Sequence, residues 1–170
     1  EPPAQFKHTL EVAMIIKKFF ALVNINCFPK TSGSEGLHIY IPIKPQFPYT
    51  MIKRTLKILC TQMEKTFSHL ITTERTKTKR KGKVYLDYLQ NGYGKTMASV
   101  YSIRPVPGAR VSTPLTWQEI ENGIDMNDFT IFNLKQRLEI YGDLFLPIYT
   151  QRQDFTPLID LINKMPDLKY

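Results

Sequence analysis

Apolar residues repeat at helical spacing in two long stretches of the chain. From 6 to 23, and again from 50 to 70, they fall at every third or fourth position. This period predicts two amphipathic helices, each with one buried face. Two shorter helices are predicted as well. One runs over 133–141 and is ended by Gly142, and the other opens at Thr156-Pro157, with Thr156 as the cap and Pro157 in the first turn.

Alternating residues predict a hairpin after the first helix. Every second residue from 37 to 43 is Leu or Ile, and a shorter strand is expected at 25–28. The segment 29–36 joins them and contains two glycines and two serines, which suit a tight exposed loop. The period of two places His38 and Tyr40 together on the face opposite the aliphatic residues.

A second hairpin is predicted further along the chain. Its strands would be 84–89 and 96–103, joined by a turn at 90–94 that contains two glycines. Asp87 stands within the first of these strands between apolar neighbours, where a carboxylate is normally excluded from a sheet core. The three prolines and one glycine of 105–115 predict an extended segment rather than a helix.

These elements together predict an α+β fold. We expect one mixed or mainly antiparallel sheet, with the helices 6–23 and 50–70 on one face and an open face opposite. Thr116 and Glu119 stand at the spacing of a capping box, which predicts a further short helix. Residues 1–170 show no repeat or linker, so a single domain is expected.

The amino-acid composition indicates which class of binding partner to expect. The chain has 170 residues, and 42% of them are hydrophobic, which is enough for a core. Its 23 Lys and Arg against 15 Asp and Glu give a net charge of +8, which favours nucleic acid, a nucleotide or an anionic membrane. No run of 18 apolar residues predicts a membrane span, so a soluble intracellular protein is expected. Cys27 and Cys60 stand alone and are interpreted as buried thiols.

Three features would converge if the two hairpins share a sheet. They are the Ser/Gly loop with His38, the run 75–83 with Asp87, and Arg104 beyond the next strand. Loop amides can bind phosphate oxygens, the guanidinium groups of Arg80 and Arg104 can bind a triphosphate, and a carboxylate can hold a divalent cation. The pattern predicts a phosphate and metal site, which is what phosphoryl and nucleotidyl transfer require.

Each feature also has a simpler interpretation. A loop such as 29–36 is most often an ordinary turn, and a strand histidine such as His38 is often only packed or solvated. The run 75–83 holds six cations in nine positions, and it can attract phosphate without specificity. Asp87 could pair with a nearby Lys or Arg. The strand tyrosines are expected first as sheet residues, although they could stack on bases.

Several linked motifs make a family resemblance specific. The segments Lys30–Pro42, Gly82–Asn91, Tyr101–Arg104 and Ser112–Trp117 resemble, in order and spacing, consecutive motifs of the polymerase domain of bacterial DNA ligase D. The similarity extends over about residues 6–145. That domain belongs to the archaeo-eukaryotic primase superfamily, so the resemblance implies a primase-like polymerase fold.

The resemblance also implies an activity. The expected function is a nucleotidyltransferase that adds nucleotides to DNA 3′ ends during bacterial non-homologous end joining, with Mn²⁺ or Mg²⁺ as cofactor. DNA ends and nucleoside triphosphates are the expected substrates. A ligase domain or end-joining proteins are the expected partners, no membrane is involved, and the location is the bacterial cytoplasm at the nucleoid.

Roles follow position by position from the same resemblance. Asp87 would be the catalytic carboxylate that binds the metal. The residues implied in nucleotide binding are Ser32, His38, Arg80, Gln90 and Arg104. Those implied in contacts with DNA phosphates are Lys79, Lys81 and Lys83.

Two departures from the family pattern bear on activity. Glu35 stands where some members have a lysine, which removes one expected phosphate contact. The family's first metal motif is an Asp-x-Asp pair, and no Asp precedes Asp87 in this sequence. The chain is therefore expected to begin just after that motif, as the C-terminal portion of the polymerase domain, and to show weak or no catalysis by itself.

Two other classes of function remain as alternatives. The first is a non-catalytic module that binds nucleic acid or nucleotide through the same basic surface. The second is a structural RNA-binding protein of ribosomal type, which the long apolar helices and the isolated Asp87 disfavour. Mn²⁺-dependent affinity for a ribonucleoside triphosphate would separate the enzyme from the binding module.

Overall fold

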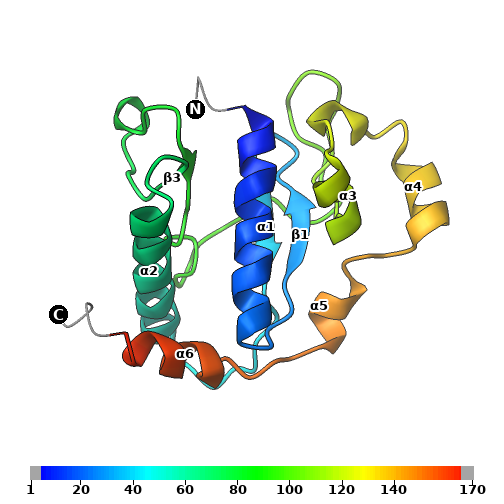
Figure 1. The fold of residues 1–170 in the computed structure, drawn as a ribbon. Helices are drawn as coiled ribbons and strands as arrows, with labels where there is room; N and C mark the ends of the chain where they lie inside the picture. Colours follow the sequence, from blue (N-terminus) through cyan, green and yellow to red (C-terminus); the bar gives the residue numbers. More distant parts are fainter. Residues whose placement is uncertain (1–4, 166–170) are drawn as a thin grey trace. The chain divides into compact units, whose positions relative to one another are not determined.

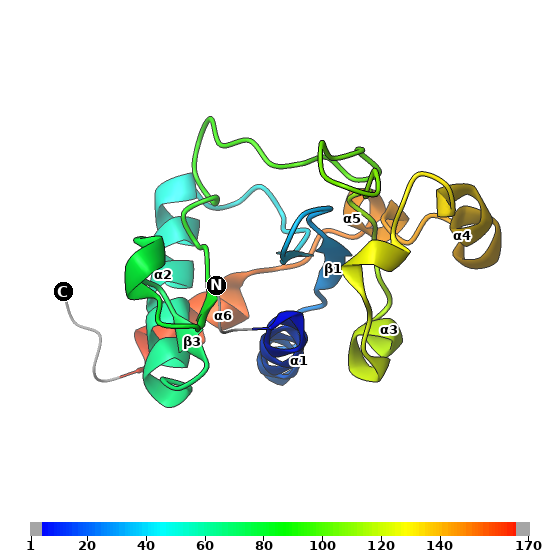
Figure 2. The same ribbon diagram turned by 90° about the horizontal axis from the view of Figure 1, so that it is seen from above.

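The computed structural model describes residues 5–165 and has the predicted α+β fold (Figures 1 and 2). Its contacts divide these residues into two compact units. Unit 1 contains the described residues of 1–8, 43–97 and 154–170, and unit 2 contains 9–42 and 98–153. Within the described residues, no helix has the length and apolar character needed to cross a membrane.

Unit 1 is built around two helices that pack against each other. They are α2, Tyr49–Thr66, and α6, Thr156–Asn163, which lie crosswise in Figure 1. The helix predicted over 50–70 is therefore confirmed, and its last turn ends four residues earlier. The helix predicted at Thr156-Pro157 is confirmed too, but its N-cap is Phe155, and Thr156 is its first helical residue. Aliphatic residues of both helices supply the buried core of this unit together with the segment after α2, namely Ile52, Leu59, Met63, Leu70, Ile71, Leu158 and Ile162.

The second predicted hairpin is wrong. Strand β4 covers only Val84–Tyr85, and it pairs in parallel with β3, Ile71–Thr72, in place of residues 96–103. The segment 70–72 is buried and begins with the apolar residues Leu70 and Ile71, which favours it as the partner of β4. The carbonyl oxygens of Leu70 and Thr72 accept hydrogen bonds from the Val84 and Leu86 amides at 2.8 and 2.9 Å. Within the described residues the result is two separate two-stranded sheets where one shared sheet was expected.

Unit 2 contains most of α1, Phe6–Leu22, and the hairpin of β1, Phe28–Thr31, with β2, Leu37–Tyr40. Helix and antiparallel hairpin are both as predicted, but β1 lies three residues later than expected. The strand is shifted because β1 pairs with a second segment besides β2. Residues 113–115 run along the other edge of β1, where Thr31 N–H donates to the Thr113 carbonyl at 2.8 Å.

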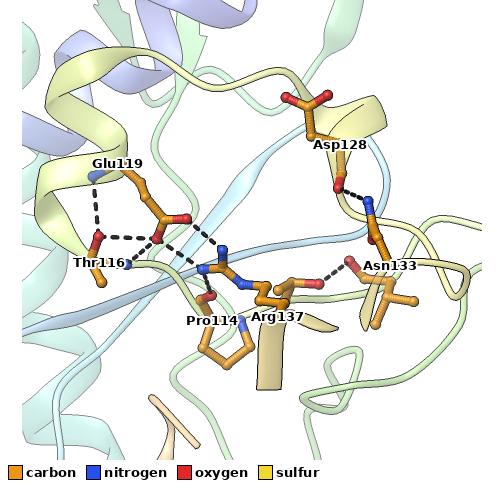
Figure 3. Close-up of polar contacts among 8 residues, drawn as sticks. Pro114, Thr116, Glu119, Asp128, Asn133 and Arg137 are labelled. Carbon is orange, nitrogen blue, oxygen red and sulfur yellow. Dashed lines mark hydrogen bonds and ion pairs between the residues drawn. The ribbon is translucent and has the colours of Figure 1, made fainter. Parts of the chain in front are cut away.

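The remaining helices of unit 2 follow that crossing segment. Helix α3, Trp117–Asn122, opens with the predicted capping box, and α4, Leu134–Tyr141, ends at Gly142 as predicted. Helix α5, Leu146–Thr150, was not predicted, because its five residues are too short to show a period. Arg137 of α4 donates to the Glu119 carboxylate and to the Pro114 carbonyl, which ties both helices to the segment before α3 (Figure 3).

Candidate anion-binding site

The loop between β1 and β2 is closed around Ser32. The Ser32 amide donates to the Gly36 carbonyl at 2.8 Å, and the Ser32 hydroxyl oxygen accepts from the amides of Ser34 and Gly36 at 3.0 and 3.1 Å. Those two amides are therefore engaged inside the loop, so the expectation that they would bind a phosphate is not met in this conformation. Glu35 is exposed at the tip of the loop.

Arg104 lies directly against this loop. Its Nη1 donates to the Ser32 carbonyl oxygen at 2.9 Å. Gly33 has φ +70°, and a Cβ at that position would stand 2.5 Å from the Arg104 Cγ and 3.0 Å from the Ser112 amide nitrogen. Glycine is required here for two reasons, the left-handed backbone and the close approach of the arginine. The predicted proximity of Ser32 and Arg104 is thus present within unit 2.

A short ladder positions Arg104. Residues 102–104 pair antiparallel with 110–112, with Ile103 opposite Val111 and the Arg104 amide donating to the Arg110 carbonyl at 2.8 Å. On the other edge, Arg110 is paired with Thr130. In this register Arg104 and Arg110 are directly opposite, so their side chains leave the ladder on the same face.

The residue that sequence reasoning missed is Lys30. It lies opposite His38 in the hairpin, and its exposed fraction is 0%. The ammonium donates to the Ser112 hydroxyl, to the Ala98 carbonyl at 3.1 Å and to the Thr31 carbonyl at 3.4 Å. Burial, followed by the positive charge of Arg104, lowers the pKa of Lys30 from 10.5 to about 8. A lysine in a short strand gave no sequence signal of this, because lysines are normally exposed.

Three buried hydroxyl groups surround the base of the loop. The Ser112 hydroxyl donates to the Thr31 carbonyl at 2.8 Å, and the hydroxyls of Thr31 and Thr113 both donate to the Val111 carbonyl at 3.0 Å. The Thr113 amide returns a bond to the Thr31 hydroxyl oxygen at 2.9 Å. The Ser112 and Thr31 hydroxyls and the Thr113 amide join β1 to the segment 111–113, and therefore hold the Ser32 loop against the ladder that carries Arg104. The Thr113 hydroxyl bonds only within 111–113.

His38 lies in β2 on the same face of the hairpin as Lys30 and Tyr40. The pairing register places Lys30 opposite His38, and the Lys30 ammonium stands 5.8 Å from the centre of the Tyr40 ring. The predicted shared environment of His38 and Tyr40 agrees with this register. Both side chains are half-buried. Burial, followed by Tyr149, raises the pKa of Tyr40.

The other predicted residues belong to unit 1. Asp87 is exposed, and its carboxylate accepts the Leu89 amide at 3.0 Å, the Gln90 side-chain amide at 3.4 Å and the Tyr85 hydroxyl at 3.5 Å. Burial, followed by the Asp87 charge, raises the pKa of Tyr85. These three donors are neutral groups.

Arg80 is placed close to the same group. Its guanidinium lies 4.0 Å from the centre of the Tyr85 ring, while Nε and Nη2 donate to the carbonyls of Glu74 and Arg75, both at 3.0 Å. Tyr85 therefore links Arg80 to Asp87. The lysines predicted to contact DNA lie around Arg80; Lys79 and Lys81 are exposed, and Lys83 is half-buried.

The six residues predicted to bind the nucleotide or the metal thus fall into two groups. Ser32, His38 and Arg104 are together in unit 2, and Arg80, Asp87 and Gln90 are together in unit 1. A divalent cation prefers several hard oxygen ligands. Within residues 5–165 no three side chains of His, Cys, Asp or Glu come together as a metal site, so the described residues do not form a complete metal site around Asp87.

Comparison with known proteins gives one consistent result. A family model described as the LigD primase-polymerase domain matches residues 1–145. The bifunctional non-homologous end joining protein LigD of Bacillus subtilis is 32% identical over 168 residues, which are 97% of this chain and 27% of that protein. The multifunctional LigD protein of Mycolicibacterium smegmatis is 32% identical over 138 residues, 81% of this chain and 18% of that protein.

The same likeness holds in three dimensions. The polymerase domain of Mycobacterium tuberculosis ligase D, solved in complex with DNA, superposes with a TM-score of 0.81 at 28% identity. The match covers 89% of this chain and 52% of that domain chain. The chain therefore spans about half of the solved domain and about a quarter or less of the two LigD proteins above.

Proposed function

Because this chain belongs to the family of LigD primase-polymerase domains, we propose that it is the nucleotide-binding part of a primase-like nucleotidyltransferase. The reaction proposed is the addition of nucleotides to DNA 3′ ends in bacterial non-homologous end joining. Its substrates are DNA ends and nucleoside triphosphates. A ligase domain or end-joining proteins are the proposed partners, and the proposed location is the bacterial cytoplasm at the nucleoid.

One observation carries the proposal. The Arg104 guanidinium contacts the carbonyl of Ser32 at 2.9 Å, in a loop whose neighbouring strand holds His38 and whose base holds the buried cation Lys30. A hydroxyl, an imidazole and a guanidinium gathered around a glycine loop make a set of donors for phosphate oxygens. Ser32, His38 and Arg104 are accordingly assigned to the triphosphate.

The residues of unit 1 complete the assignment. Arg80 and Gln90 are proposed to contact the nucleotide, and Asp87 to supply a carboxylate oxygen to Mn²⁺ or Mg²⁺. Such an ion would neutralise phosphate charge during nucleotidyl transfer. The basic residues Lys79, Lys81 and Lys83 are proposed to attract the DNA backbone.

The test measures binding before catalysis. A fluorescent ATP analogue is titrated into the purified chain with and without Mn²⁺, and Arg104→Ala is compared with Arg152→Ala, an exposed arginine of the same unit. We expect Arg104→Ala to weaken binding by about tenfold or more, because a charged hydrogen bond is worth about 1.5–3 kcal/mol, and Arg152→Ala to change it little. Equal affinities of both variants and the wild type would rule the site out.

A second candidate function is a nucleotide- or DNA-binding module without catalysis. It is favoured by the observation that within residues 5–165 no three side chains of His, Cys, Asp or Glu are grouped as a metal site. The two functions differ in their response to metal. If Mn²⁺ raises the nucleotide affinity of wild type but not that of Asp87→Asn, the enzyme is supported. If neither Mn²⁺ nor Asp87→Asn changes the nucleotide affinity, the binding module is supported.

A further inference from the structure

We propose that Lys30 is a positioning residue of the anion-binding site, which holds the Ser32 loop against the ladder that carries Arg104 and places a positive charge behind both. The inference rests on the proposed binding of a polyphosphate at this site. Lys30 itself does not need to touch the ligand. It acts through the backbone and side chains of its neighbours.

The contacts of Lys30 join three separate parts of unit 2. Its acceptors are a carbonyl of β1, the carbonyl of Ala98 and the hydroxyl of Ser112. The β1 carbonyl belongs to Thr31, the residue directly before Ser32. Ser112 directly follows Val111, whose ladder partner is Ile103, and Ile103 precedes Arg104. One ammonium therefore ties the loop and the arginine to the same point.

The energetic cost of this arrangement argues for a function. Lysine is almost never fully buried unless it is paired with an acid, and here the acceptors within the described residues are neutral oxygens. An apolar side chain at this place in a strand would avoid the desolvation of an ammonium. Burying the ammonium therefore costs stability, and the lowered pKa of Lys30 reflects the same cost.

The surrounding charges indicate an anionic ligand. Arg104 is close enough to Lys30 to lower the pKa of the ammonium. Arg110 leaves the ladder on the same face as Arg104, and its Nε is buried without a hydrogen-bond acceptor among the described residues. Lys30 and Arg104 lie at the Ser32 loop, and Arg110 lies opposite Arg104 on the ladder, with no carboxylate among the contacts of the three side chains in residues 5–165. Their mutual repulsion would be relieved by a bound anion. A polyphosphate supplies several negative oxygens at once and fits this requirement.

The experiment uses two neighbouring hydroxyl residues as a matched pair. Ser112→Ala removes one of the three acceptors of Lys30, whereas Thr113→Val removes an equally buried hydroxyl that bonds neither Lys30 nor β1. Binding of inorganic tripolyphosphate and of ATP is measured by calorimetry on wild type, both variants and Lys30→Met, at a temperature at which each is folded.

We expect Lys30→Met to weaken the binding of both probes by about tenfold or more, and Ser112→Ala to weaken it by several-fold. Thr113→Val should bind within about twofold of wild type even if its melting temperature falls by as much as that of Ser112→Ala. A role in stability alone would instead make affinity follow melting temperature in all variants. Should Lys30→Met fail to fold, the comparison of Ser112→Ala with Thr113→Val still decides the question.

The outcomes separate this inference from the proposed function. If wild type binds neither probe, the proposed site itself is wrong and the role of Lys30 falls with it. If wild type binds and Arg104→Ala does not, while Ser112→Ala and Lys30→Met bind as wild type does, the site stands and the role of Lys30 is overturned. Weaker binding by Ser112→Ala than by Thr113→Val supports the proposal.

Discussion

Arg137 binds both carboxylate oxygens of Glu119, with Nη1 2.5 Å from Oε1 and Nη2 2.8 Å from Oε2. The side chains are only 15% and 18% exposed, so this ion pair is largely withdrawn from water. Glu119 also accepts the Thr116 amide in the capping box, and Arg137 Nη2 donates to the Pro114 carbonyl at 2.8 Å (Figure 3). One carboxylate thus fixes the start of α3, the position of α4 and the end of the segment that borders β1.

Replacing that carboxylate should be costly. We expect Glu119→Ala to lower the free energy of unfolding by about 3 kcal/mol, because it breaks a largely buried ion pair and removes half of a capping box. Glu121→Ala, at an exposed position of the same helix, should change it by less than about 0.5 kcal/mol. Denaturant unfolding of both variants gives the comparison, and similar losses for the two would contradict the role assigned to Glu119.

The ion pair of Glu119 and Arg137 should make the free energy of unfolding depend on pH in the acidic range. Burial would raise the pKa of Glu119, but hydrogen bonds from Arg137 and Thr116 outweigh it and hold the pKa below its usual value of 4.5. The unfolded state therefore takes up the proton first as pH falls, and the contribution of Glu119 is present above pH 4.5 and lost below it. The stability difference between wild type and Glu119→Gln should shrink over that acidic range, as measured by unfolding at several pH values.

Substitution by alanine should lower stability at one glycine of the Ser32 loop and have little effect at the other. Gly33→Ala places a Cβ against Arg104 and the Ser112 amide on a left-handed backbone, so it should lower stability by about 1–2 kcal/mol and weaken polyphosphate binding. Gly36→Ala meets no atom within 4 Å, and its stability should stay near that of wild type. Thermal melting and probe titration of the pair test this, and a harmless Gly33→Ala would mean that the loop can move away from Arg104.

The long helices could be predicted because their periods extend over four or more turns. Helix α1 ends one residue before the predicted bound, and α2 keeps its predicted start within one residue. The hairpin over 84–103 failed for a different reason. Strand β4 contributes only two residues, and its partner Ile71–Thr72 is chosen by burial in the tertiary fold, which alternation within one segment does not reveal.

In the candidate site, too, some residues could be predicted from the sequence and others depend on the tertiary fold. Ser32, His38 and Arg104 were found because a family motif marks them, and unit 2 brings Ser32 to Arg104. Lys30 belongs to the same motif, yet its burial depends on Ala98 and Ser112, which are 68 and 82 residues away in sequence. The joint action of these residues with Arg80, Asp87 and Gln90 stays a prediction.

The two thiols should react slowly in the folded protein. Burial, against a smaller opposing effect of Lys17, raises the pKa of Cys27 to about 11, and burial together with Asp87 and Glu64 raises that of Cys60 to about 12. The thiolate is the reactive form, so at pH 8 little of either is available. A chromogenic disulfide reagent should react with both cysteines much more slowly in buffer than in guanidinium. Equal rates would show that the thiols are accessible and ionised as free cysteine is.

The buried ammonium of Lys30 should make the free energy of unfolding depend on pH in the alkaline range. Its pKa in the folded chain, about 8, lies below the value of 10.5 for a free lysine. Between these values the folded state releases the Lys30 proton while the unfolded state keeps it, so the unfolded state binds more protons and stability gains as pH rises. Groups that face the ammonium and titrate or carry charge are Arg104, Tyr40 and His38.

We therefore expect the free energy of unfolding of wild type, taken relative to Lys30→Met, to rise between about pH 8 and pH 10.5 and to be lowest below that range. The thiols and phenols that lose stability at high pH are the same in both proteins, so they largely cancel in the difference. Parallel denaturant titrations at half-unit intervals measure it. A difference that stays constant from pH 7 to 10 would show that Lys30 keeps an ordinary ammonium in the fold, and that the cost of burying its charge is met by another group.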